Sequence, residues 1–138
     1  MVDAEVISRR LEKLREYIGY LKELRNKPEQ VFITDPFIYG NAERYLQLAI
    51  QSMLDIGNHL IADQAEGRPE EYRDIFEIMG KAGILSQEFA AKLQPLAGLR
   101  NILVHDYLEV DRKKIYHLLQ EHLKDFEEYS RAIVDDIT

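Results

Sequence analysis

Apolar side chains recur at steps of three and four residues along almost the whole chain, and this spacing constrains the fold more than any other feature. The spacing places apolar residues on one face of an α-helix, whereas a half-buried strand alternates at every second residue. The sequence contains no strand-like alternation, internal repeat or low-complexity tract. It therefore predicts an all-α fold.

About five amphipathic helices are predicted, and most of them have a capping or breaking residue at an end. Thr34 or Asp35 caps the second helix, with Pro36 at its first position, while Ser86 and Asp111 cap the fourth and fifth. The links are short, which is typical of an up-and-down bundle, and the length suits a single domain over 1–138. The expected helices span about 6–24, 36–62, 67 to Gly80 or Gly83, 86–105 and 111–133.

Several classes of protein are disfavoured by what the sequence lacks. There is no cysteine, so disulfides, thiolate zinc sites and a cysteine nucleophile are excluded. The four histidines form no His-x3-His pair, and we expect no metal site. No apolar run approaches the roughly 20 residues that span a bilayer, and the first residues lack the apolar segment of a signal peptide. We therefore expect a cytoplasmic protein that makes no contact with membranes.

Arg100 interrupts the apolar stripe of the fourth predicted helix, where it lies in line with Leu96 and Leu103. An unpaired buried charge is very costly, so this arginine must be paired or must line a cleft. One interpretation is a structural ion pair with Glu43 or Asp55 of the second helix. The other is that the arginine lines a cleft.

His105 lies five residues beyond Arg100, about 140° around an ideal helix, so the two side chains do not share a face. The two side chains border one cleft only if the long arginine side chain extends around the helix and the regular helix is distorted near Asp106. Asn101 lies on a different, more polar face of the same helix. A histidine at a helix end is also explained as a solvated residue stabilised by the helix dipole.

The formal net charge of −7 argues against a chain that coats nucleic acid without specificity, because phosphate affinity comes from cations. RNA binding would need a local basic patch, or a dimer that pools two of them. The run of Arg112, Lys113 and Lys114 is one candidate, although these residues are equally explained as solvated charges. A polar stripe on the second helix is a solvated face, a dimer surface or a substrate surface; it comprises Arg44, Gln47, Gln51, Asp55 and Asn58.

The segment RNILVHDY, from Arg100 to Tyr107, resembles the R-x4-H-x-Y signature of HEPN-domain toxins of the HepT type. The likeness extends over roughly residues 1–130. It implies a helical protomer that dimerises so that two motifs face a shared cleft. It also implies RNA cleavage without a metal or other cofactor, with Arg100, His105 and Asn101 as site residues.

The same resemblance implies a partner, a minimal nucleotidyltransferase that acts as antitoxin and silences the nuclease by transferring AMP to Tyr107. Two alternatives remain open. In the first, the chain is a non-catalytic module in which Arg100 and His105 hold a nucleotide or substrate for that partner. In the second, it is a structural helical partner in which Arg100 forms a buried ion pair.

Overall fold

The computed structural model describes residues 3–64 and 67–138, and every regular element in these two ranges is helical. The predicted all-α class is therefore confirmed. The elements in chain order are α1 (Ala4–Leu24), α2 (Glu29–Thr34), α3 (Pro36–Gln64), α4 (Tyr72–Lys81), α5 (Gln87–His105), the 3-10 helix η1 (Tyr107–Glu109), α6 (Arg112–Glu121) and α7 (Leu123–Ile137).

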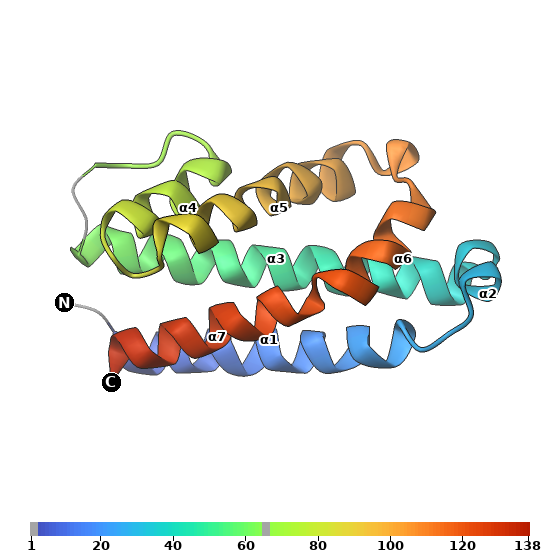
Figure 1. Cartoon of the computed structure of the whole chain (residues 1–138), viewed down its shortest axis with the longest axis horizontal. Coiled ribbons are helices and arrows are strands. Elements are labelled where there is room, and N and C mark those ends of the chain that lie inside the picture. The colour runs from blue at the N-terminus through green and yellow to red at the C-terminus, as the bar shows by residue number, and fades with distance from the viewer. Residues whose placement is uncertain (1–2, 65–66) are drawn as a thin grey trace.

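The long helix α3 runs through the middle of the bundle and contacts helices on both sides (Figure 1). On one side α1 packs against α3, and α7 packs against α1. On the other side α4 and α5 pack against α3 and against each other. Within the described part of the chain, no helix combines the length and the apolar character needed to cross a membrane.

Three of the predicted caps are present. The Asp35 carboxylate accepts a hydrogen bond from the backbone N–H of Phe37 at 2.9 Å, directly before α3. The Ser86 hydroxyl accepts from the N–H of Phe89 at 3.1 Å. At the start of α6, the Asp111 carboxylate accepts from the N–H of Lys113 at 3.1 Å. These contacts satisfy N–H groups that have no partner inside the helix, and they fix where each helix begins.

The helix count exceeds the predicted five partly because α2 lies in a stretch expected to be a link. Pro28 precedes this short helix, and the ring of Phe32 in its middle is fully buried. Phe32 meets Tyr116 of α6 edge to face, with ring centres 5.2 Å apart. Burial of this ring therefore accounts for a helix in a segment that was expected to be a link.

The predicted fifth helix is divided in two at His122, whose backbone φ of −118° and ψ of −1° depart from the values of a regular α-helix. The division allows α6 to pack on α2 while α7 packs along α1. Just beyond it, the carboxylate of the buried Asp125 lies 3.1 Å from His122 Nδ1 and 3.3 Å from Lys92 Nζ. These contacts give the buried charge partners on two sides, as its burial requires.

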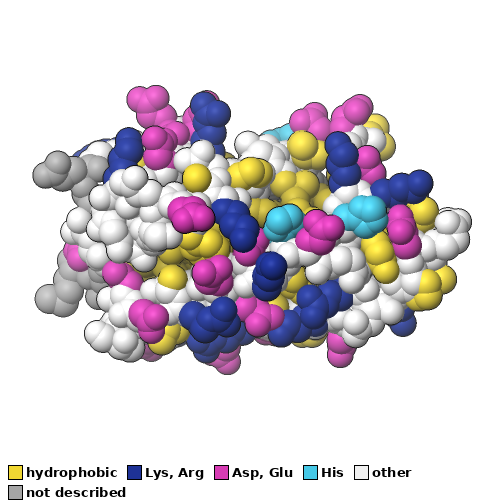
Figure 2. All heavy atoms as spheres, in the orientation of Figure 1, with side chains coloured by type: hydrophobic (Ala, Val, Ile, Leu, Met, Phe, Trp, Pro, Cys, Tyr) yellow, Lys and Arg dark blue, Asp and Glu magenta, His cyan; other side chains and the backbone are white. Residues whose placement is uncertain are grey.

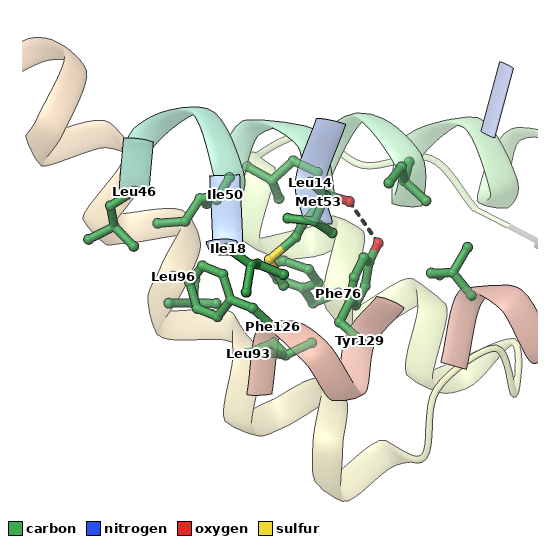
Figure 3. Packing of buried hydrophobic residues seen from close by; sticks show 14 of the residues in the cluster. Leu14, Ile18, Leu46, Ile50, Met53, Phe76, Leu93, Leu96, Phe126 and Tyr129 are labelled. Carbon is green, nitrogen blue, oxygen red and sulfur yellow. Dashed lines mark hydrogen bonds between the residues drawn. The ribbon is translucent and has the colours of Figure 1, made fainter. Parts of the chain in front are cut away.

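The core is formed where α1, α3, α4, α5 and α7 converge (Figure 3). Within it, the fully buried Tyr129 donates a hydrogen bond from its hydroxyl to the backbone carbonyl of Met53 at 2.7 Å. Burial raises the pKa of Tyr129 well above its ordinary range, so the ring stays neutral. Apolar side chains from all five helices belong to the same core, among them Leu14, Ile18, Leu46, Ile50, Phe76, Leu93, Leu96 and Phe126.

Candidate functional site

Arg100 is half-buried on α5 and is held by three neighbours. Its Nε donates a hydrogen bond to Oε1 of Gln51 at 2.8 Å, and its Nη1 donates to Oδ1 of Asn101 at 3.0 Å. The central carbon of the guanidinium lies 4.5 Å from the centre of the Tyr72 ring, within the range of a cation–π contact. Two polar contacts and one aromatic contact therefore fix a cation that interrupts an apolar stripe.

The predicted ion pair between Arg100 and Glu43 or Asp55 is wrong. Asp55 lies one turn beyond Gln51 on α3, and its Oδ2 is 3.3 Å from Nη1 of Arg10. Its other oxygen, Oδ1, accepts a hydrogen bond from Nε2 of Gln51 at 2.8 Å. Asp55 thus reaches Arg100 only through the Gln51 amide. Sequence reasoning considered the correct face of α3 but expected a carboxylate where a neutral amide makes the contact.

Glu43 lies two turns before Gln51 on α3 and belongs to a different group of residues. It is half-buried, and this burial raises the pKa of its carboxyl, while the positive charge of Arg112 partly opposes the rise. Arg112 itself lies over the Tyr39 ring, 3.7 Å from the ring centre, and donates to the carbonyl of Ile33 at 3.3 Å. Glu43 is therefore next to Arg112 and not to Arg100.

Gln51 and Tyr72 are the two site residues that sequence reasoning did not single out. Gln51 stands in the polar stripe of α3, whose most economical interpretation is a solvated face, yet it is half-buried. Tyr72 opens α4 after a linking segment and gives no periodic signal. With Asn101, Ala97 and Gly98, Tyr72 lines a surface cavity of about 440 Å³. Arg100 lies beside this cavity through its contacts with Tyr72 and Asn101.

His105 is the last residue of α5, and its imidazole is exposed. The helix ends there because Asp106 adopts φ −125° and ψ 42°, which confirms the distortion expected at this point. In residues 3–64 and 67–138, no side chain forms a hydrogen bond or ion pair with this imidazole. The structure therefore brings Asn101 into contact with Arg100, and it leaves His105 open to solvent at the end of the same helix.

Tyr107 opens the 3-10 helix η1 and is 66% exposed, so its hydroxyl is accessible to another macromolecule. It lines a surface cavity of about 550 Å³ together with Tyr39, Glu43 and Arg112. The neighbouring Leu108 is 85% exposed. The motif thus ends in an accessible phenol beside a cavity that contains an arginine.

Acidic and basic side chains are interspersed on the face shown in Figure 2, with no broad surface of one charge. The predicted basic run begins α6, where Arg112, Lys113 and Lys114 are all exposed and Arg112 also stacks on Tyr39. That this run forms a patch for RNA stays a prediction. Across the described ranges, no three histidine, aspartate or glutamate side chains are grouped so that they could hold a metal ion.

Comparison with protein families gives one match that spans nearly the whole chain. The model of a family described as ribonuclease HepT-like matches residues 7–133, which include every site residue described above. A tRNA nuclease HepT from Aphanizomenon flos-aquae is 30% identical over 132 residues, which cover 96% of this chain and 90% of the relative. An mRNA nuclease HepT from Shewanella oneidensis is 36% identical over 88 residues, 64% of this chain and 66% of that protein.

Comparison with solved structures shows that the fold is also similar to that of a HEPN toxin. The tri-AMPylated HEPN toxin of Shewanella oneidensis, in complex with an MNT antitoxin, superposes with a TM-score of 0.86 at 28% sequence identity. The superposition covers 94% of this chain and 97% of the toxin. The likeness therefore extends to the whole helical arrangement and is not confined to the motif on α5.

Proposed function

The chain belongs to the ribonuclease HepT-like family, and on that basis we propose that it is a toxin that cleaves single-stranded RNA without a metal ion. The observation that carries the proposal is how the Arg100 guanidinium is held and which charges lie next to it. This cation is held by Gln51, Asn101 and Tyr72, and no carboxylate among the residues that the structure describes is in direct contact with it. A fixed guanidinium with N–H groups to spare is suited to bind the phosphate of an RNA backbone.

The proposed reaction is an attack of the ribose 2′-oxygen on the neighbouring phosphorus. The 2′-hydroxyl loses its proton, a bond forms between O2′ and phosphorus, and the bond from phosphorus to O5′ breaks. The leaving O5′ takes up a proton, so the products carry a 2′,3′-cyclic phosphate and a 5′-hydroxyl. Arg100 stabilises the negative charge that grows on the phosphate oxygens during this displacement.

His105 is proposed to move one of these protons. Imidazole has an unperturbed pKa near ~6.5 and therefore acts as either base or acid at neutral pH. The side chain is exposed at the end of α5, where RNA has access to it. One protomer supplies a single motif histidine, whereas the reaction needs one group to take a proton and another to give one. A homodimer in which two motifs face one cleft would provide both groups.

Tyr107 is proposed as the site at which activity is switched off. A nucleotidyltransferase antitoxin would join Tyr107 Oη to the α-phosphorus of ATP, with loss of the phenolic proton and departure of pyrophosphate. The added AMP places bulk and negative charge two residues from His105, which repels an anionic substrate. Exposure of Tyr107 and the AMP groups on the Shewanella oneidensis toxin support this proposal.

Digestion of a single-stranded RNA of defined sequence by the purified chain in excess EDTA tests the proposed function. We expect fragments whose new ends are a 2′,3′-cyclic phosphate and a 5′-hydroxyl, as identified by mass spectrometry. Fragments that carry a 3′-hydroxyl and a 5′-phosphate would contradict the proposed reaction. Binding of nucleotides without cleavage of any RNA would favour the non-catalytic module instead.

A further inference from the structure

A chain of two hydrogen bonds joins Asp55 to Arg100 through the side chain of Gln51. Nε2 of Gln51 donates to Asp55 Oδ1 at 2.8 Å, and Oε1 of Gln51 accepts from Arg100 Nε at 2.8 Å. The orientation of the amide is fixed by chemistry, because a carboxylate only accepts and a guanidinium only donates. Gln51 therefore has one orientation that satisfies both neighbours, and Asp55 holds it there.

The charge of Asp55 is compensated from the opposite side. Its Oδ2 lies 3.3 Å from Nη1 of Arg10 on α1, so the carboxylate forms its ion pair away from Arg100. Gln51 and Asp55 lie one turn apart on α3 and are both half-buried. Three helices, α1, α3 and α5, thus contribute to an ordered series of side chains: Arg10, Asp55, Gln51 and Arg100.

The contacts of Arg100 leave a defined part of its guanidinium available. Gln51 occupies Nε, Asn101 accepts from Nη1, and Tyr72 lies against the flat face. A guanidinium has five N–H donors, and both donors of Nη2 have no partner among the residues that the structure describes. A phosphate that approaches this edge meets an oriented donor group.

The residue type at position 51 also determines how much positive charge remains at this edge. A carboxylate at hydrogen-bond distance from Nε would hold the guanidinium equally well but would place a negative charge beside it. The interaction of two charges increases as their separation falls, so such a carboxylate would oppose the binding of a phosphate at the same cation. An amide supplies the hydrogen bond without the charge.

We infer that Gln51 is a positioning residue: its amide, oriented by Asp55, fixes the Arg100 guanidinium and leaves its positive charge free for an RNA phosphate. The inference rests on the proposed function and adds a residue outside the R-x4-H motif to the site. It also explains why the carboxylate on this face of α3 is kept one amide away from Arg100.

Two variants of Gln51 separate its two proposed effects, which are to fix the Arg100 guanidinium and to leave the positive charge of that group free. Gln51→Met keeps the length of the side chain and removes both hydrogen bonds. Gln51→Glu keeps an acceptor for Arg100 Nε but loses the donor to Asp55 Oδ1 and adds a negative charge beside the guanidinium. The matched controls are Gln47→Met and Gln47→Glu. Gln47 lies one turn earlier on α3, is also half-buried, and forms no side-chain hydrogen bond within the described ranges.

The first readout is the Arg100 Nε–H signal in ¹H–¹⁵N spectra of the full chain, assigned by its absence from Arg100→Lys. We expect slow exchange with water in the wild-type chain and in Gln51→Glu, and fast exchange in Gln51→Met. The second readout is RNA cleavage, with kcat and KM measured separately. We expect kcat/KM to fall at least about tenfold in both Gln51 variants, chiefly through kcat in Gln51→Met and with a raised KM in Gln51→Glu.

The Gln47 variants should retain the Nε–H signal and a kcat/KM within about twofold of the wild-type value. A wild-type chain that cleaves RNA, with Gln51 variants that cleave it equally well, would overturn this inference and leave the proposed function standing. A wild-type chain that cleaves no RNA would overturn the proposed function and the role of Gln51 together. A wild-type Nε–H signal in fast exchange would overturn the positioning role whatever the activity.

Discussion

The guanidinium of Arg100 lies over the ring of Tyr72, 4.5 Å from the ring centre, and so links α5 to the first residue of α4. A cation–π contact at a partly exposed site contributes about 0.5–1 kcal/mol. We expect Tyr72→Leu to lower kcat/KM for RNA by about threefold to fivefold relative to Tyr72→Phe, which keeps an aromatic face. Steady-state cleavage rates check this, and equal rates for the two variants would show that the ring does not orient Arg100.

Tyr107 is expected to be the residue that takes up AMP. Its ring is 66% exposed, whereas Tyr129 is fully buried and hydrogen-bonded. Incubation with ATP and a nucleotidyltransferase antitoxin should add the mass of one or more AMP units to the wild-type chain and none to Tyr107→Phe. Intact mass spectrometry measures the additions. The same additions to Tyr107→Phe would place the modification elsewhere.

Two glycines on helices should respond in opposite directions to alanine. A Cβ on Gly57 would lie 2.7 Å from Ile75 Cγ2 and from Met79 Sδ, so these side chains or α4 itself would have to shift. We expect Gly57→Ala to lower the free energy of unfolding by about 1–3 kcal/mol, the usual cost of overpacking. Nothing lies within 4 Å of the corresponding position on Gly19. Gly19→Ala should therefore raise the free energy of unfolding by about 0.5–1 kcal/mol.

Urea denaturation of the two alanine variants measures both effects. A Gly57→Ala variant as stable as the wild-type chain would contradict the close approach of α3 to α4. The Gly19→Ala variant serves as the control, because it makes the same chemical change in a helix without the steric clash.

Glu43 should make stability depend on pH. Burial raises the pKa of its carboxyl above the ordinary value of 4.5, so the folded chain holds this proton more tightly than the unfolded chain does. The contribution of Glu43 to stability is therefore fully present below about pH 4.5 and declines as pH rises through the folded-state pKa. Glu43→Gln cannot lose a proton, and its stability relative to the wild-type chain should rise between about pH 4 and pH 7.

Chemical denaturation at several pH values checks the Glu43 prediction. A relative stability of Glu43→Gln that falls with rising pH would mean that attraction to Arg112 outweighs the cost of burial. Arg112→Gln tests the same balance from the other side, because it removes the opposing charge and should increase the dependence on pH.

The helices were predictable where local chemistry determines them, as at the caps Asp35, Ser86 and Asp111. The short helix α2 was not predictable, because tertiary contacts stabilise it, above all the burial of Phe32. The division at His122 was missed for a similar reason. The apolar stripe continues through this residue, and the change of direction serves contacts with α2 and α1, which are distant in sequence.

At the site, Arg100 was recognisable from the sequence because a cation in an apolar stripe is anomalous. The side chains that hold it could not be recognised in the same way. Gln51 lies 49 residues away on a face that also carries Asp55, and periodicity does not distinguish which of two polar residues one turn apart makes the contact. An expectation based on charge favoured the carboxylate. The structure shows that Arg10 binds that carboxylate instead.

The central claim is that Arg100 and His105 carry out RNA cleavage without a metal ion. The most direct test is the rate at which single-stranded RNA is cut in excess EDTA by the wild-type chain, Arg100→Ala, His105→Ala and the control His117→Ala. His117 is also exposed but lies on α6, outside the motif. We expect both motif variants to lose at least about 100-fold in rate while remaining folded, and His117→Ala to keep the wild-type rate. Cleavage that requires added metal, or that persists in both motif variants, would contradict the account.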